Sequence, residues 1–197
     1  MSDRETLDVY AAKAAEYADL VKDAGDDPMV QRFIAAVPAG TKVLDIGCGP
    51  GFAAAAMAQA GLDAHAWDPV PEMLALASAH PGVTARQAGY EDLSGEDMYG
   101  GVWSNFSMLH TPLAKWPDYF AAIHAALIPG GIFHFGTKLG TGEARDSIGR
   151  LYSYMTEDAL TDLLTRTGFD ITYTRTGEEA GLSGEVAPFI VLQATRA

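Results

Sequence analysis

Hydrophobic residues near the start of the chain recur at steps of three and four, the spacing that places them on one face of an α-helix. This stripe predicts a helix that ends at the segment Gly25-Asp26-Asp27-Pro28. Pro28 suits the first turn of a second, short helix, where a missing amide hydrogen costs nothing. The stripe consists of Leu7, Tyr10, Ala11, Ala14, Tyr17, Ala18 and Val21.

From position 41 onward, short apolar runs alternate with segments of helical character. Strands are expected over 43–46, 63–67, 83–87, 101–105, 132–135, 171–174 and 189–194. Helices are expected over 52–60, 70–79, 117–127 and between the N-cap Thr156 and Gly168. This alternation predicts an α/β fold with a doubly wound sheet. No helix separates the last two strands, so they are expected to pair as an antiparallel hairpin.

The composition is that of one packed domain. The chain has 197 residues, of which 48% are hydrophobic and 20% charged, so it has ample material for a core. We expect a single domain over 1–197, with a helical segment at 1–40 before an α/β core at 41–197. The only cysteine, Cys48, excludes an intramolecular disulfide and a cysteine-based zinc cluster.

The charge balance limits the partners. With 13 basic against 26 acidic residues, the net charge of −13 repels polyanions, so neither nucleic acid nor an anionic membrane is an expected partner. We see no secretory signal at residues 1–5 and no apolar run of about 20 residues, the length that a spanning helix needs. A cytoplasmic protein, monomeric or homodimeric, is therefore expected.

The candidate chemistry starts at the segment Gly47-Cys48-Gly49-Pro50-Gly51, which joins a predicted strand directly to a helix. A glycine-rich turn at this place lets a ligand approach the backbone closely, as in nucleotide-binding crevices. The dinucleotide fingerprint would need glycine at position 52, which is Phe52, and a phosphate-binding loop is absent. Two acids flank the turn: Asp45 precedes it, and Asp68 ends the next strand.

These residues resemble the cofactor motif of class I S-adenosylmethionine-dependent methyltransferases. Residues 43–51 match its glycine motif, Asp68 matches its ribose-binding acid, and 127–131 are similar to its L-x-P-G-G turn. The resemblance implies a Rossmann-like sheet of seven strands in the order 3-2-1-4-5-7-6, with strand 7 antiparallel. It also implies an amino-terminal helical lid at 1–40 and S-adenosylmethionine as cofactor, with no metal.

The resemblance and the residues together suggest three groups of site residues. One departure is that Gly89 stands where the family often has an adenine-binding acid, so Tyr90, Glu91 or Asp92 is expected to substitute. Catalytic roles are assigned to His110 and Tyr152. Cofactor binding is assigned to Tyr17, Asp45, Gly47, Gly49, Gly51, Asp68, Met73, Tyr90, Glu91 and Asn105. Substrate binding is assigned to Tyr10, Arg145, Arg150 and Tyr154.

Structural interpretations remain open for several of these residues. Asp45 would also cap backbone amides of the turn, and Met73 would also serve as core. His110 would also cap a helix, whereas a catalytic role would make it a general base. The arginines at 145 and 150 would merely shape a solvated loop through Arg–Asp pairs.

Taken together, the sequence predicts a transferase that methylates a small molecule by direct in-line displacement, with alignment as the main catalytic contribution. Enzymes that methylate nucleic-acid bases resemble Asn/Asp-Pro-Pro-Tyr/Phe after the fourth strand, and residues 105–108 lack those prolines. The alternative is a non-catalytic S-adenosylmethionine-binding sensor or scaffold, which turnover would distinguish.

Overall fold

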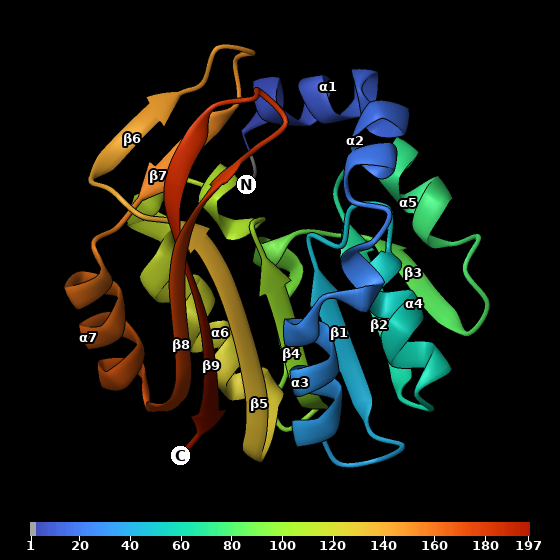
Figure 1. Ribbon diagram of the computed structural model, residues 1–197. Coiled ribbons are helices and arrows are strands. Elements are labelled where there is room, and N and C mark those ends of the chain that lie inside the picture. Colours follow the sequence, from blue (N-terminus) through green and yellow to red (C-terminus); the bar gives the residue numbers. More distant parts are fainter. Residues whose placement is uncertain (1–2) are drawn as a thin grey trace.

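A seven-stranded sheet forms the centre of the computed structural model, which describes residues 3–197 (Figure 1). Its strands lie in the order β3-β2-β1-β4-β5-β9-β8, where β9 is antiparallel to both neighbours and the other pairs are parallel. This confirms the predicted fold class and strand order. The strands are β1 (Lys42–Ile46), β2 (Asp63–Asp68), β3 (Val83–Gln87), β4 (Tyr99–Asn105), β5 (Leu127–Lys138), β8 (Phe169–Ala180) and β9 (Val186–Arg196).

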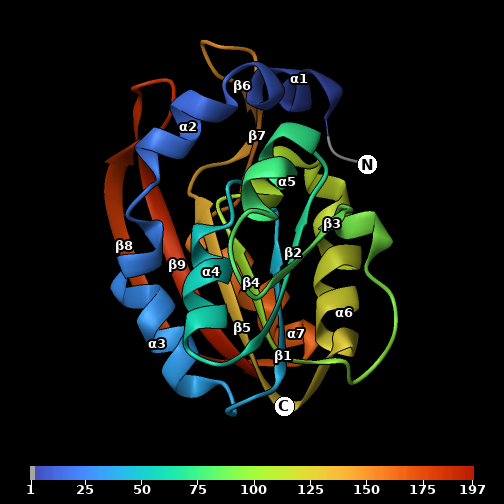
Figure 2. The ribbon, with the colours of Figure 1, turned by 90° about the vertical axis from the view of Figure 1, so that its right-hand side faces the viewer.

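Helices cover both faces of this sheet (Figure 2). On one face, α3 (Pro28–Ala36) and α4 (Phe52–Gln59) bury Phe33 and Met57 against the sheet. On the other face, α6 (Trp116–Ala126) and α7 (Glu157–Thr167) bury Phe120 and Leu160. The helix α5 (Pro71–Ala77) joins β2 to β3 and contacts both strands. Short 3₁₀ turns are η1 (Ala24–Asp26), η2 (Tyr90–Asp92), η3 (Met108–His110) and η4 (Leu113–Lys115).

The helix boundaries follow the capping chemistry of the sequence. The Thr156 hydroxyl accepts the Ala159 amide at 3.3 Å, and Gly168 ends α7 in the left-handed region at φ 101°. Asp27 caps α3 by accepting the Met29 amide at 2.7 Å, with Pro28 in the first turn as expected. Within residues 3–197, no helix has the length and apolar character needed to cross a membrane.

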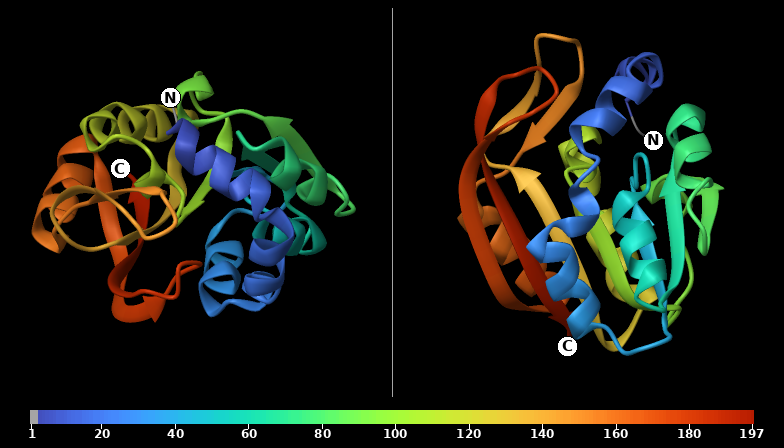
Figure 3. Two further views of the ribbon diagram at one scale, coloured as in Figure 1. Left: turned by 90° about the horizontal axis from the view of Figure 1, so that it is seen from above. Right: turned by 45° about the vertical axis from the view of Figure 1, so that its right-hand side comes forward.

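The amino-terminal stripe forms two helices rather than the one expected. The chain breaks at Lys13, between α1 (Arg4–Ala12) and α2 (Ala14–Leu20). Both helices lie across the carboxyl ends of the central strands (Figure 3). The break lets Tyr10 and Tyr17 meet edge to face with ring centroids 5.2 Å apart, an arrangement suited to packing over a site.

A second difference lies between β5 and α7, where a loop was expected. There, β6 (Gly142–Arg145) and β7 (Leu151–Tyr154) form a two-stranded antiparallel sheet beside α1. Contacts with distant residues stabilise it: the Leu151 amide donates to the Thr6 hydroxyl at 2.8 Å, and Arg145 pairs with Asp3 at 2.9 Å. Periodicity along one segment cannot reveal such contacts, which explains why the hairpin was missed.

Candidate functional site

The glycine turn connects β1 to α4 at the carboxyl edge of the sheet. Gly47, Gly49 and Gly51 all have positive φ angles, of 72°, 53° and 82°. A Cβ atom at Gly47 would lie 2.3 Å from the Cβ of Ser107, so a side chain there is excluded by contact as well as by conformation. The Gly47 and Cys48 amides donate to the Trp67 carbonyl, which holds the turn against β2.

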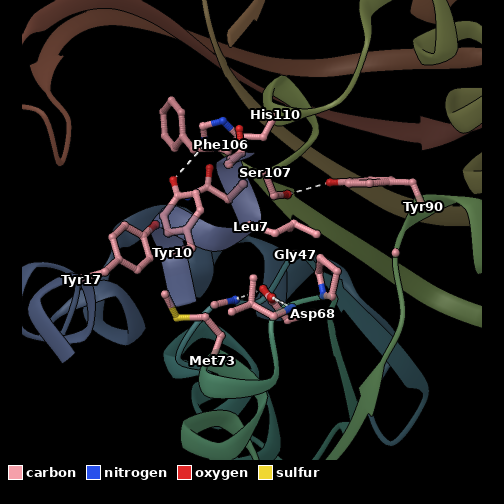
Figure 4. Close-up of a pocket in the computed structure, with 16 residues that line it drawn as sticks. Leu7, Tyr10, Tyr17, Gly47, Asp68, Met73, Tyr90, Phe106, Ser107 and His110 are labelled. Carbon is pink, nitrogen blue, oxygen red and sulfur yellow. Dashed lines mark hydrogen bonds between the residues drawn. The ribbon is translucent and has the colours of Figure 1, made fainter. Parts of the chain in front are cut away.

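Two adjoining cavities open beside this turn. The first cavity lies between the end of β2 and α1, with Asp68 and Met73 on one side and Leu7 and Tyr10 on the other (Figure 4), and Val70 also lines it. The second cavity lies toward β5 and the hairpin β6–β7, and Asp45, Trp103, Lys138, Arg150 and Tyr152 are among its lining residues. The wall common to both is formed by Tyr10, Tyr17, Gly47, Gly49, Asn105, Phe106 and His110.

Asp68 joins the glycine turn to the first cavity. Its two carboxylate oxygens accept the Gly49 and Val70 amides, both at 2.8 Å. Burial raises the pKa of Asp68 to about 6, although the two backbone hydrogen bonds act in the opposite direction. Each carboxylate oxygen has a second lone pair, so Asp68 is able to accept two further hydrogen bonds from a diol.

Asp45 is a buried acid with an unpaired oxygen. Among the atoms that the structure describes, none forms a hydrogen bond with Asp45 Oδ2. Burial, followed by the nearby charge of Asp68, raises the pKa of Asp45 to about 8. A ligand ammonium near this carboxylate would supply the missing charge partner.

The Tyr90 hydroxyl holds together the ends of β1 and β4. It shares hydrogen bonds with Ser104 at 2.7 Å and Ser107 at 2.6 Å, and Ser107 donates to the Ile46 carbonyl at 2.9 Å. Burial raises the pKa of Tyr90, so its hydroxyl stays protonated. Sequence reasoning found Tyr90 but missed Ser107, although the position of Ser107 two residues after the end of β4 is the signal that would have indicated it.

A chain of buried polar groups crosses the wall between the cavities. His110 Nδ1 lies 2.7 Å from the Leu151 carbonyl, which only accepts, so Nδ1 carries the proton. His110 Nε2 is then an acceptor for the Tyr10 hydroxyl at 2.8 Å, and Arg150 donates to the same hydroxyl at 2.8 Å. Burial lowers the pKa of His110 to about 4, so the ring is neutral with Nε2 as its basic atom.

Arg150 is itself held by an acid on its own hairpin. Its Nε and Nη2 atoms donate to Asp146 Oδ2 at 2.9 and 2.7 Å, and both side chains are buried. The Arg150–Asp146 pair agrees with the interpretation that the loop arginines have a structural role. Arg150 nevertheless also lines the second cavity. The geometry therefore places Arg150 where it orients Tyr10 at the edge of the site.

Most predicted site residues come together at the two cavities, and four do not. Gly51 shapes the turn from outside, since its added Cβ would meet Ala77 at 2.8 Å. Arg145 is exposed and pairs with Asp3 and Glu5. Tyr154 stacks on Tyr152, with ring centroids 5.9 Å apart. Within the described residues 3–197, the linings of the two cavities do not include Gly51, Glu91, Arg145 or Tyr154.

Phe106 is a lining residue that sequence reasoning did not single out. This residue has φ 50°, an unfavourable conformation for a non-glycine residue, and it lines both cavities. Lys138 lies at the carboxyl end of β5, a position at which a site residue is expected in an open α/β sheet. Glu179 reaches the second cavity from β8.

Comparison with known proteins gives a consistent result. Residues 43–131 match the family described as methyltransferase domain. Over 105 residues, the chain is 34% identical to the ubiquinone biosynthesis O-methyltransferase of Xanthomonas axonopodis pv. citri (strain 306). That match covers 51% of this chain and 44% of the relative, less than half of its length.

Solved structures share the fold over nearly the whole chain. The Burkholderia thailandensis 1,6-didemethyltoxoflavin-N1-methyltransferase, crystallised with bound 1,6-didemethyltoxoflavin and S-adenosylhomocysteine, aligns with a TM-score of 0.78 and 24% identity. This alignment covers 98% of the present chain and 88% of the other. A putative S-adenosylmethionine-dependent methyltransferase from Listeria monocytogenes aligns with a TM-score of 0.70 at 20% identity, covering 90% and 99% of the two chains.

Proposed function

We propose that the protein methylates a small organic molecule. The premise is that residues 43–131 match the methyltransferase-domain family and that the chain shares its fold with S-adenosylmethionine-dependent methyltransferases. One observation carries the proposal. The first cavity has the buried acid Asp68 beside the glycine turn, and it adjoins the second cavity, which has the buried acid Asp45 and several aromatic side chains; Phe106 and His110 belong to both. Two ligands bound there would meet at the common wall.

The first cavity, together with the adjoining part of the second, fits the cofactor by the chemistry of its lining residues. Asp68, in the first cavity, has lone pairs for the ribose hydroxyls. Asp45 lines the second cavity beside the glycine turn, and its unpaired oxygen is suited to the methionine ammonium. Val70 and Met73 offer apolar surface to the adenine, with Tyr90 at the end of the first cavity. Tyr17 and Asn105 are placed on the common wall, where the methionine part would lie.

The bound cofactor supplies a sulfonium methyl group that is already activated toward a nucleophile. The protein therefore has to align the acceptor and remove its proton. His110 Nε2 is the basic atom at the common wall, and the Leu151 carbonyl fixes the ring orientation and tautomer. An acceptor hydroxyl or amine that replaced Tyr10 as the hydrogen-bond donor to Nε2 would give up its proton there. Tyr152, edge-on to His110 at 4.8 Å, supports the ring.

A small substrate agrees with how the second cavity is enclosed. Its lining includes residues of α2, β5, β7 and the end of β8, segments that lie far apart in sequence but border one space. The net charge of −13 agrees with an acceptor other than nucleic acid. The O-methyltransferase and N-methyltransferase named above act on small molecules, which agrees with this substrate class.

The direct test has two steps. Calorimetric titration with S-adenosylhomocysteine should give one site per chain, and absence of binding would contradict the proposal. Isotopically labelled methyl transfer into a metabolite extract, followed by mass spectrometry, should then yield a labelled small molecule. Binding without any labelled product would instead indicate the sensor or scaffold alternative.

Replacing His110 with asparagine should lower kcat about 100-fold on the substrate found in that screen, because general-base catalysis typically contributes about 10²–10⁴-fold. Initial rates at saturating substrate measure the effect, and the affinity for S-adenosylhomocysteine serves as a check on the fold. His65→Asn, on β2 away from both cavities, is the matched control. An unchanged kcat in His110→Asn would remove His110 from the mechanism.

Cofactor binding should release a proton from Asp45. Because burial raises the pKa of Asp45 to about 8, this carboxyl is mainly protonated at pH 7, whereas a bound ammonium favours the ionised form. Affinity for S-adenosylhomocysteine should therefore rise with pH between 6 and 8, by up to about tenfold per unit. Calorimetry in buffers of different ionisation enthalpy measures the proton released. At pH 7.5, where Asp68 with its pKa of about 6 is already ionised, Asp45→Asn should remove most of the release and the exposed control Asp63→Asn should not.

A further inference from the structure

We propose that Lys138 and Phe106 select the acceptor, and that this acceptor is a planar aromatic molecule carrying an anionic oxygen group. The inference rests on the proposed function and names the substrate class of the second cavity. It starts from the two cationic side chains that the described residues contribute to that cavity, Lys138 and Arg150.

Arg150 has its charge matched within the protein. Asp146 accepts from two of its nitrogen atoms, and Tyr10 accepts from a third. A guanidinium engaged in this way has little capacity left for a ligand anion. Arg150 therefore serves the site by holding Tyr10.

The charge of Lys138 is balanced far less completely by protein groups. Its side chain is 7% exposed, and its ammonium donates to the Glu179 carbonyl at 3.1 Å. The Glu179 carboxylate is 3.6 Å away and half exposed to solvent. An ammonium has three donors, so a buried one with a single short hydrogen bond has capacity for an oxygen anion. Burial also lowers the pKa of Lys138, which agrees with incomplete pairing.

Aromatic rings surround the ammonium. Lys138 Nζ lies 5.5 Å from the ring centre of Phe106 and 6.0 Å from that of Phe189. Phe106 has the left-handed φ of 50° and lines both cavities, so its ring lies where the two ligands would meet. Strained backbone of this kind persists where the surroundings enforce it, commonly at ligand sites. A planar substrate on Phe106 would place an acidic substituent toward Lys138.

The competing interpretation is that Lys138 only ties β8 to β5 through Glu179. The two interpretations predict different changes in anion affinity when Glu179 is replaced. If Glu179 only attaches β8 to Lys138, Glu179→Gln should loosen the β8–β9 hairpin without raising the affinity for an anion. If it competes with the substrate for the ammonium, removing its charge should strengthen anion binding.

The test measures ligand binding to the protein saturated with S-adenosylhomocysteine, by calorimetry at pH 8. Three probes are used: catechol, which is neutral, 3,4-dihydroxybenzoate, which carries a carboxylate, and 4-nitrocatechol, which carries an ionised ring hydroxyl. We expect at least one anionic probe to bind about tenfold more tightly than catechol. Preference for the benzoate identifies a carboxylate substrate, and preference for nitrocatechol identifies a phenolate.

Three variants then assign the preference to residues. Lys138→Met, similar in length but uncharged, should reduce the preference to within twofold, and Glu179→Gln should increase affinity for the anionic probe about threefold. Lys115→Met, an exposed lysine on η4, should change neither. A preference that survives in Lys138→Met, equal binding of all probes, or binding of none would overturn the inference.

Failure of this inference is separable from failure of the proposed function. The titration with S-adenosylhomocysteine comes first, and absence of that binding contradicts the methyltransferase itself. Normal binding of S-adenosylhomocysteine by every variant, with no discrimination among the probes, contradicts only the substrate class.

Discussion

Asp68→Ala is expected to weaken binding of S-adenosylhomocysteine about 1,000-fold. Two hydrogen bonds from the ribose hydroxyls to an ionised carboxylate would be lost, each contributing about 1.5–3 kcal/mol. A loss of about 4 kcal/mol corresponds to that factor, at 1.4 kcal/mol per tenfold change. Isothermal titration at pH 8, where the Asp68 carboxyl with its pKa of about 6 is ionised, measures the effect.

Asp68 also accepts the Gly49 and Val70 amides, so the alanine variant loses support for the glycine turn. Asp68→Asn keeps one acceptor oxygen and should retain the fold. Its affinity for S-adenosylhomocysteine should still fall at least about tenfold, because the NH₂ group that replaces the second oxygen cannot accept a hydrogen bond. Asp63→Ala, on the same strand but exposed, should bind normally. Wild-type affinity in Asp68→Asn would contradict the ribose assignment.

Arg150→Met should lower the free energy of unfolding by about 3–5 kcal/mol, the usual effect of removing one partner from a buried ion pair. The Asp146 side chain is 5% exposed and would be left charged without its partner. The Tyr10 hydroxyl would lose its donor as well. Urea denaturation followed by circular dichroism measures the change.

The double variant Arg150→Met with Asp146→Asn tests the cause of this loss. Removing the unpaired Asp146 charge should restore part of the free energy of unfolding, because the effect of the single change comes mainly from a buried carboxylate without a partner. Arg166→Met, which breaks the exposed pair with Asp162, should change stability little. If Arg150→Met were no more harmful than Arg166→Met, the buried pair would not stabilise the hairpin.

Features that depend on nearby residues were predictable from the sequence. The alternation of strands and helices, the caps at Thr156 and Gly168, and the glycine turn all follow from short-range chemistry, and the structure contains them. The acids Asp45 and Asp68 were found for the same reason, since each lies at the end of a strand beside the turn. Sheet order came from the family resemblance rather than from local pattern.

Features that depend on distant pairing were not predictable. Tyr10 meets Arg150 across 140 positions, and Lys138 meets Glu179 across 41. The hairpin β6–β7 has only four residues in each strand, and β6 is exposed along its whole length, so the segment lacks the periodic apolar signal of a core strand. Lys138 was visible at the start of the loop that follows β5, and Glu179 was expected near the mouth of the site, but nothing local indicated that these two side chains would pair.

The helix α1 has a kinetic consequence that follows from its place in both walls. Tyr10 belongs to α1 and borders the cofactor cavity and the acceptor cavity alike, and its hydroxyl bridges His110 and Arg150. A single outward movement of α1 would therefore expose both ligands to solvent at once. If both ligands leave by this route, exchange of spent cofactor and release of methylated product share one opening rate, and that rate sets the upper limit of turnover.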